Sequence, residues 1–183
     1  MMILIVGGSG CGKSAYAEKR IMELSLDGAM RYYLATMQVY GEEGRRKVQR
    51  HVELRKNKGM LTIEQTRDVS EALPKMQEGP KVVLLEDMGN LVANEMFGED
   101  GTMTPWEIVA DKIVMQLRQM NSSLDHLVIV SNNVFEDGID YEEGTRDYLR
   151  ALGKVNAELA GDAAQVVEVV AGIPLFLKET KDD

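Results

Sequence analysis

Short apolar segments alternate with longer amphipathic segments along this 183-residue chain. Each apolar segment is a nearly continuous aliphatic run, which is typical of strands in a parallel sheet that helices cover on both faces. These runs lie at 2–6, 32–36, 82–86, 127–131 and 166–170. Helical periodicity predicts helices between them, over 13–26, 42–58, 68–78, 105–120 and 145–160. The alternation predicts a three-layer α/β domain with a mostly parallel sheet.

The fourth predicted helix has a start signal in its sequence. The residues TPWE predict Thr104 as the N-cap, Pro105 at the first helical position and Glu107 as the closing residue of a capping box. Apolar residues then recur at helical spacing, at Ile108, Ile113, Leu117 and Met120. This spacing predicts a helix with one apolar face.

The chain closes on two apolar runs that flank Ala171-Gly172. This arrangement predicts an antiparallel hairpin at the edge of the sheet. We expect a single domain over residues 1–178, followed by a polar tail, 179–183, that frays.

Charge and cysteine content narrow the classes of function. A formal net charge of -9 argues against nucleic acid as the main partner, because phosphate backbones need a broad cationic face. The single cysteine, Cys11, excludes an internal disulfide framework and predicts a reducing, cytoplasmic location. The apolar opening MMILIV has six residues, too few for a membrane span, and predicts a buried strand.

The segment GGSGCGKS fits the pattern G-x-x-x-x-G-K-[ST] between a predicted strand and a predicted helix. Its glycines allow successive backbone amides to point at one anion, and the following helix adds its positive end. Lys13 is expected to reach the terminal phosphates, and the Ser14 hydroxyl is expected to bind Mg²⁺. The expected phosphate-binding residues are Gly7, Gly8, Ser9, Gly10, Cys11, Gly12, Lys13 and Ser14. The alternative is a glycine turn with no ligand, and Cys11 is expected to pack rather than to react.

Magnesium in such a site also needs a carboxylate at the end of a neighbouring strand. The run VVLLED offers Glu86 and Asp87 at its end. We favour Glu86, because alternation along a strand aims the two side chains in opposite directions. The alternative is a solvated strand end without a metal.

A histidine lies in a basic segment, KVQRHVELR at 47–55. The neighbouring cations favour the neutral form of the His51 imidazole, which can attack a phosphorus atom while arginines hold the anionic oxygens. Lys47, His51 and Arg55 lie on one face of the predicted helix. The alternative is a basic helix face that is simply solvated, and a phosphate loop alone leaves the reaction open.

Several segments together resemble the adenosylcobinamide kinase / adenosylcobinamide-phosphate guanylyltransferase family of cobalamin biosynthesis. The phosphate loop is generic, whereas the histidine segment and the closing segments in this order are specific. The matching segments are MILIVGGSGCGKSAYAE, YLATM at 33–37, KVQRHVELR with TIE at 62–64, LLEDMGNLVANEMF at 84–97, VIVSNNV at 128–134, GKVNAELA at 153–160 and VVEVVAGIPLFLK at 166–178.

The resemblance implies a RecA-like P-loop fold, a homotrimer, and two reactions on a corrinoid substrate. One reaction phosphorylates the cobinamide hydroxyl with ATP or GTP, and the other transfers GMP from GTP through a guanylylated histidine. That histidine corresponds to His51. Lys47, Arg55 and Glu64 then correspond to nucleotide-binding positions, and Lys13, Ser14 and Glu86 correspond to the phosphate and metal residues.

Several positions differ from the family pattern: Val52 replaces a basic residue, Lys56 a proline, Met60 a tryptophan and Asn133 an acid. The triplet Tyr148-Leu149-Arg150 stands where the family has Phe-Arg-Asp, so Leu149 replaces an arginine. They fall in substrate-side segments, so two other functions stay open. The first is a small-molecule kinase without guanylyl transfer. The second is a nucleotide-dependent regulatory protein without turnover, against which the retention of His51 beside the loop residues argues.

Overall fold

The computed structural model describes residues 1–25, 28–38, 58–98, 100–134 and 141–180. The described residues therefore do not include His51, Lys47, Arg55 or Val52. They also leave out most of the helix predicted over 42–58. The strands are β1 (Met2–Val6), β2 (Met30–Ala35), β3 (Met60–Glu64), β4 (Lys81–Glu86), β5 (His126–Val130), β6 (Gln165–Val170) and β7 (Ile173–Glu179). The helices are α1 (Lys13–Leu24), the 3₁₀ helix η1 (Val69–Lys75), α3 (Met88–Met96), α4 (Trp106–Ser123) and α5 (Glu143–Asp162).

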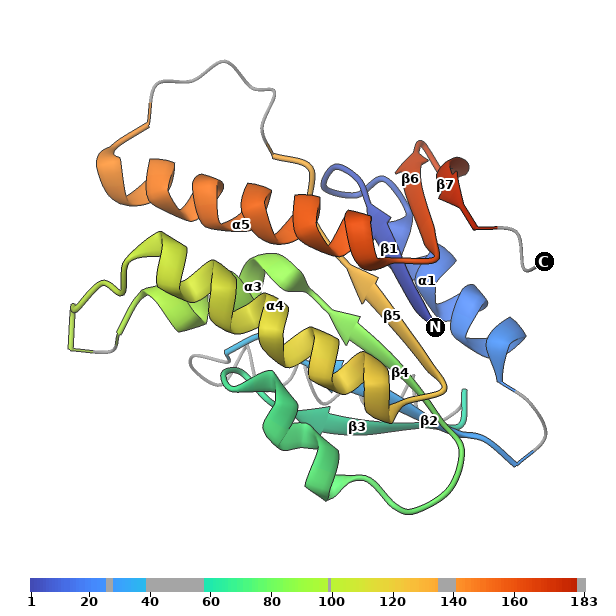
Figure 1. Ribbon diagram of the computed structural model, residues 1–183. Helices are drawn as coiled ribbons and strands as arrows, with labels where there is room; N and C mark the ends of the chain where they lie inside the picture. Colours follow the sequence, from blue (N-terminus) through green and yellow to red (C-terminus); the bar gives the residue numbers. More distant parts are fainter. Residues whose placement is uncertain (26–27, 39–57, 99, 135–140, 181–183) are drawn as a thin grey trace.

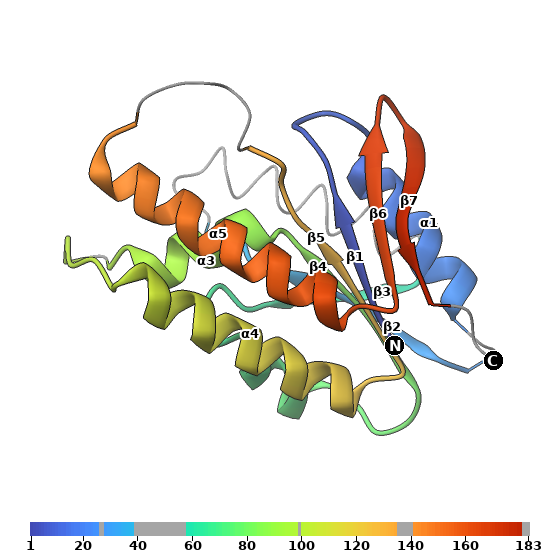
Figure 2. The same cartoon turned by 45° about the horizontal axis from the view of Figure 1, so that its top comes forward.

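The strands form one sheet in the order β3-β2-β4-β5-β1-β6-β7. All neighbouring pairs are parallel except β6 and β7, which pair antiparallel. Figure 1 shows α3, α4 and α5 on one face of the sheet, and Figure 2 shows α1 on the other face. The predicted mostly parallel sheet with a C-terminal hairpin is therefore confirmed.

The continuous apolar character of the strands follows from burial on both faces. Along β1, Met2 and Leu4 join the core under α3, α4 and α5, whereas Ile3 and Ile5 join the core under α1. None of these four side chains is more than 1% exposed. Polar substitution at any of these four positions would therefore bury an unpaired group in one core or the other.

Three elements differ from the sequence predictions, and the first is α3, which lies outside every predicted helix range. The strand β3 was not predicted, because this five-residue edge strand is mostly half-exposed or exposed and lacks a long aliphatic run. The helix predicted over 68–78 is a short 3₁₀ helix, Val69–Lys75, with Pro74 inside it. Proline lacks the amide that a longer α-helix would need at this position.

The start of α4 also differs from the prediction. Pro105 is the N-cap and no side chain caps the helix, so the capping box through Thr104 and Glu107 does not form. Instead, the Thr104 amide donates to the Met96 carbonyl at 2.8 Å, which turns the chain back on α3. Ile108 is 59% exposed, because the buried face is centred on Val109, its neighbour.

The hairpin turn is built as predicted. Ala171 and Gly172 both have left-handed backbone conformations, with φ of 49° and 81°. Two consecutive residues of this kind suit the tight turns that match the twist of paired strands. The strand β7 continues through Glu179, one residue beyond the expected end of the domain, and the Thr180 amide donates to the Ala164 carbonyl at 2.8 Å. The rest of the expected tail, 181–183, lies outside the described residues.

Within the described ranges, no helix is both long enough and apolar enough to cross a bilayer.

An ionic cluster fixes η1 to the helical layer. The Lys112 ammonium lies 2.7 Å from Asp68 Oδ1 and 2.7 Å from Glu95 Oε2. The Glu95 side chain is only 5% exposed, and its other oxygen accepts from the Asp68 amide at 2.7 Å. The hydrogen bond from Lys112 holds the pKa of Asp68 below its ordinary value. Lys112 thus balances two carboxylates, one of them buried.

We expect Lys112→Met to lower the free energy of unfolding at pH 7 by about 2 kcal/mol, because it leaves Glu95 buried without its cation. Urea denaturation checks this value. The pKa of Asp68 is lower in the folded chain than in the unfolded chain, so its share of the stability is present at neutral pH. That share is lost as the pH falls through the folded pKa, and the difference between wild type and variant should shrink there.

Lys154→Met is the matched control. It removes an ammonium paired with Asp111, whose side chain is 64% exposed, so water replaces the lost partner. A loss as large in this variant as in Lys112→Met would contradict a special role for the buried carboxylate.

Candidate nucleotide-binding site

The glycine-rich segment connects β1 to α1 as predicted. Gly10 and Gly12 have φ of 67° and 94°, a left-handed conformation that only glycine adopts without strain. The helix α1 then begins at Lys13, and no side chain caps it. The first amides of α1 are therefore not occupied by a cap, and its positive end faces the loop. This geometry suits an anion such as a phosphate.

Close packing on both sides holds the loop in place. The Asn133 amide donates to the Gly7 carbonyl at 3.1 Å from the end of β5, and the Gly172 amide donates to the Cys11 carbonyl at 2.8 Å from the hairpin turn. A Cβ at Gly7 would lie 2.6 Å from Cys11 Sγ and 2.7 Å from the Val169 carbonyl oxygen. Cys11 itself packs against the core under α1, as expected.

Lys13 is buried over the loop, with 8% of its surface exposed. Its ammonium donates to the Gly8 carbonyl at 2.9 Å, within the loop that it is expected to serve. Ser14 follows it in the first turn of α1 and is half-buried. A positive charge and a hydroxyl are thus placed beside the amides that the loop presents.

The two acidic side chains at the end of β4, Glu86 and Asp87, have different hydrogen-bond partners. The Glu86 carboxylate accepts from the Tyr33 hydroxyl at 3.2 Å. Asp87 caps α3, because its Oδ1 accepts from the Asn90 amide at 2.7 Å. The Thr36 hydroxyl holds the Asp87 main chain, donating to its carbonyl at 2.8 Å and accepting from its amide at 2.9 Å. Of the two carboxylates, Asp87 is the one that caps a helix.

The strand order corrects the expectation that the magnesium carboxylate ends a strand next to β1. β4 is not the strand next to β1, since β5 lies between them. At the usual strand spacing, the ends of β1 and β4 are about 10 Å apart. Mg²⁺ keeps several of its waters when it binds to proteins, so Ser14 and Glu86 could share an ion through water. Within the described residues, no three His, Cys, Asp or Glu side chains cluster as a metal site.

The remaining positions named in the sequence analysis lie on several different strands. Glu64 ends β3, which lies four strand positions from β1, and Met60 in the same strand is buried in the core under α1. Asn133, in the place of a family acid, donates to the Glu168 carboxylate at 3.4 Å. A carboxylate from β6 therefore lies beside the position where the acid is missing.

A polar bridge that sequence reasoning did not identify joins β5 to α5. The fully buried Ser131 donates through its hydroxyl to Asn156 Oδ1 at 2.6 Å, and the Asn156 amide donates to the Asn132 carbonyl at 3.4 Å. The signal was present as polar residues directly after an apolar strand and inside an amphipathic helix. This bridge joins the segment VSN to the segment GKVN.

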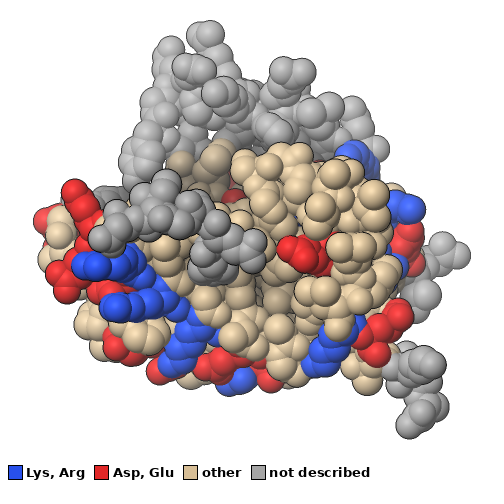
Figure 3. Space-filling model, turned by 90° about the horizontal axis from the view of Figure 1, so that it is seen from above, with Lys and Arg blue, Asp and Glu red and all other residues tan. Residues whose placement is uncertain are grey.

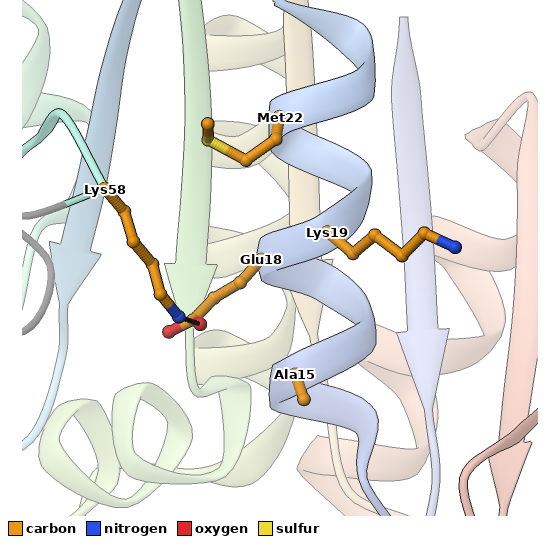
Figure 4. A pocket seen from close by; sticks show the side chains of 5 residues that line it. All are labelled: Ala15, Glu18, Lys19, Met22 and Lys58. Atoms are coloured by element: carbon orange, nitrogen blue, oxygen red, sulfur yellow. Dashed lines mark hydrogen bonds and ion pairs between the residues drawn. The ribbon is translucent and has the colours of Figure 1, made fainter.

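After the basic segment, the described chain resumes beside α1. Lys58, the first described residue after it, pairs with Glu18 across a shallow hollow of about 320 Å³ (Figure 4). The hollow is lined by Ala15, Glu18, Lys19, Met22 and Lys58. From above (Figure 3), acidic and basic side chains alternate along the margin, and the described residues form no broad cationic patch on this face. Lys58 is thus tied to the helix that carries Lys13.

Comparisons with known proteins agree with this geometry. A profile of the family described as cobinamide kinase / cobinamide phosphate guanyltransferase matches residues 3–177. The bifunctional adenosylcobalamin biosynthesis proteins CobU of Escherichia coli (strain K12) and Salmonella typhimurium (strain LT2) are each 28% identical to this chain over 186 residues. Each of these matches covers 97% of this chain and 100% of the relative.

Two solved structures share the fold at lower identity. One is an ATPase domain with a TM-score of 0.58 and 13% identity, and the match covers 100% of this chain and 78% of that one. The other is the flagellar accessory protein FlaH from Methanocaldococcus jannaschii, with a TM-score of 0.53 and 12% identity, covering 97% of this chain and 78% of that one. These neighbours confirm the predicted three-layer, RecA-like P-loop fold.

We expect Gly7→Ala to lower the free energy of unfolding by about 2 kcal/mol, because the new methyl group would overlap Cys11 Sγ and the Val169 carbonyl. Thermal or urea unfolding checks the loss. Gly8→Ala is the control for stability, since a Cβ there meets nothing within 4 Å. Equal stability of the two variants would show that the loop does not pack as described.

Proposed function

The chain belongs to the cobinamide kinase / cobinamide phosphate guanyltransferase family and is therefore a transferase, and we propose that it catalyses both reactions of that name. In the first, a nucleoside triphosphate phosphorylates the hydroxyl of adenosylcobinamide. In the second, GMP passes from GTP to adenosylcobinamide phosphate through a guanylylated His51. The observation that carries this proposal is the phosphate loop, with Lys13 buried over it and the first turn of α1 uncapped.

We assign the phosphate and metal roles as follows. The loop amides orient the triphosphate, and Lys13 supplies a positive charge near its terminal phosphates. Ser14 and Glu86 hold Mg²⁺, which would neutralise the charge that develops on the leaving group. Glu86 suits this role better than Asp87, because the Asp87 carboxylate already caps α3.

A kinase without guanylyl transfer is the second candidate, favoured by the absence of the family acid at Asn133. The hydrogen bond from Asn133 to Glu168 weighs against it. An amide that holds a carboxylate next to the loop supplies the missing charge from a different strand, so the substitution need not abolish the second activity.

We also propose that the chain forms a homo-oligomer, and we expect a trimer. The edge strand β7 supports self-association, since Ile173, Phe176 and Leu177 are each more than half exposed. Exposed apolar side chains on a free sheet edge favour pairing with a second copy. Light scattering on purified protein measures the mass, and a monomer at micromolar concentration would overturn this proposal.

Incubation with adenosylcobinamide, GTP and Mg²⁺, followed by product analysis, tests the main proposal. We expect wild type to form both the phosphorylated and the GDP-linked corrinoid. Lys13→Ala should lose both products while keeping its unfolding midpoint, because the buried ammonium serves the phosphates rather than the core. Equal catalytic efficiency of Lys13→Ala and wild type would exclude the phosphate-loop mechanism.

We expect His51→Ala to abolish covalent labelling by GTP labelled at the α-phosphate, while nucleotide binding persists. A phosphoramidate is acid-labile, so the wild-type label should disappear on acid treatment. His126→Ala is the control, because His126 begins β5, at the end of the sheet away from the loop. Wild type that phosphorylates the corrinoid but never takes up label would establish the kinase-only function.

A further inference from the structure

Three polar side chains from three elements converge on the first turn of α3. A Cβ built on Gly89 would lie 2.8 Å from Asn132 Nδ2, 2.9 Å from the Tyr148 hydroxyl and 3.4 Å from Asp87 Oδ1. Asn132 follows β5, Tyr148 belongs to α5 and Asp87 caps α3. Only a glycine at position 89 lets them approach so closely. We call Asp87, Asn132 and Tyr148 the α3 cluster.

The α3 cluster has hydrogen-bonding capacity to spare. Neither the Tyr148 hydroxyl nor the Asn132 side-chain amide makes a hydrogen bond to the described part of the chain, and Asp87 uses only Oδ1 for its cap. Burial raises the pKa of Tyr148, and the negative charge of Asp87 raises it further. The phenol therefore keeps its proton and remains a donor. The cluster offers two donors, and Asp87 has a second carboxylate oxygen that its cap does not use.

The cluster lies beside the phosphate loop. Asn132 precedes Asn133, whose amide donates to the Gly7 carbonyl at 3.1 Å. Asn156 fixes the main chain on the other side, by accepting from Ser131 and donating to the Asn132 carbonyl. Asn132 is thus held at the end of β5, between the loop after β1 and the helix after β4.

The combination of groups selects one kind of ligand. An alcohol needs a hydrogen-bond acceptor for its proton and donors for its lone pairs, and the α3 cluster provides both. A phosphate oxygen would suffer repulsion from the Asp87 carboxylate. The set therefore matches the group that receives a phosphoryl unit better than it matches the unit itself.

We propose that the α3 cluster binds the acceptor hydroxyl of the phosphoryl transfer, with Asp87 as the catalytic base and Asn132 and Tyr148 as the donors that orient the hydroxyl oxygen. This inference rests on the proposed kinase function. The acceptor O–H bond breaks and its proton passes to the free oxygen of Asp87. The acceptor oxygen bonds to the γ-phosphorus, and the bond from that phosphorus to the β-γ bridging oxygen breaks. The nucleoside diphosphate leaves with the electron pair.

This proposal gives two adjacent acids different roles. Glu86 binds the metal, and Asp87 accepts the proton of the alcohol. Asp87→Asn keeps an oxygen for the α3 cap, since asparagine caps helices as well as aspartate does. We expect kcat for corrinoid phosphorylation to fall about 100-fold in Asp87→Asn with an unchanged Mg²⁺ requirement. Glu86→Gln should instead raise the Mg²⁺ concentration needed for half-maximal activity.

Tyr148→Phe removes only a hydroxyl. We expect kcat/KM for adenosylcobinamide to fall about fivefold to tenfold, mainly through KM, with KM for the nucleotide unchanged. Tyr16→Phe is the matched control, because burial also raises the pKa of Tyr16, a half-buried tyrosine on α1. If Tyr148→Phe does not fold, Asn132→Ala replaces it with the same expectation, and unfolding midpoints decide between the two.

The outcomes separate the two levels of the proposal. Wild type that transfers phosphate, together with a selective corrinoid defect in Tyr148→Phe and the kcat defect in Asp87→Asn, supports the inference. Wild type that transfers phosphate while Tyr148→Phe behaves like Tyr16→Phe overturns the inference and leaves the kinase function standing. Wild type that phosphorylates no corrinoid overturns the kinase function and the inference together.

Discussion

The phosphate loop depends on hydrogen bonds that extend the pairing of β1 beyond the ends of its neighbouring strands. The Ser131 amide donates to the Ile5 carbonyl at 2.9 Å, and two residues later the Asn133 amide donates to the Gly7 carbonyl. On the other flank, the turn between β6 and β7 reaches Cys11. A loop rich in glycine has a large conformational entropy when free. Fixing it from both flanks places its amides before any ligand arrives.

The helical layer is held over this edge of the sheet by polar bridges. Thr36 binds the main chain at the start of α3, and Asn94 in α3 donates to the Thr36 carbonyl at 2.7 Å. Ser131 and Asn156 do the same between β5 and α5. Hydrogen bonds have preferred directions, whereas apolar contacts tolerate sliding. Polar bridges at the edge therefore set the positions of α3 and α5 more tightly than the apolar core could.

Much of the fold could be predicted from sequence because its signals are local. Strands buried on both faces give aliphatic runs, and the phosphate loop is complete within eight residues. The strand β3 was not predicted, because an edge strand with a half-exposed pattern gives no such run. The predicted capping box at Thr104 was wrong, because the Thr104 amide donates to the Met96 carbonyl instead. That contact depends on the tertiary fold.

The site likewise contains residues that a local pattern predicts and residues that only the tertiary fold brings together. Lys13 and Ser14 are defined by their own segment, and the structure has both in the first turn of α1. The α3 cluster has no local signature, since it exists only when α5 lies over α3 and residue 89 has no side chain. A tyrosine on an amphipathic helix is typical of a packing residue until the fold brings a carboxylate and an amide to it.

The charge distribution supports a polyanion as substrate despite the net charge of -9. Seven of the 21 Lys and Arg residues lie between positions 45 and 58: Arg45, Arg46, Lys47, Arg50, Arg55, Lys56 and Lys58. At physiological salt, charges more than about 8 Å apart are largely screened in solvent. A bound triphosphate therefore responds to the cations near it and only weakly to the acidic surface elsewhere. The ion pair between Lys58 and Glu18 ties the last of these cations to α1, the helix that begins at Lys13. A cationic segment of this kind would let an acidic protein bind the triphosphate that we propose as its substrate.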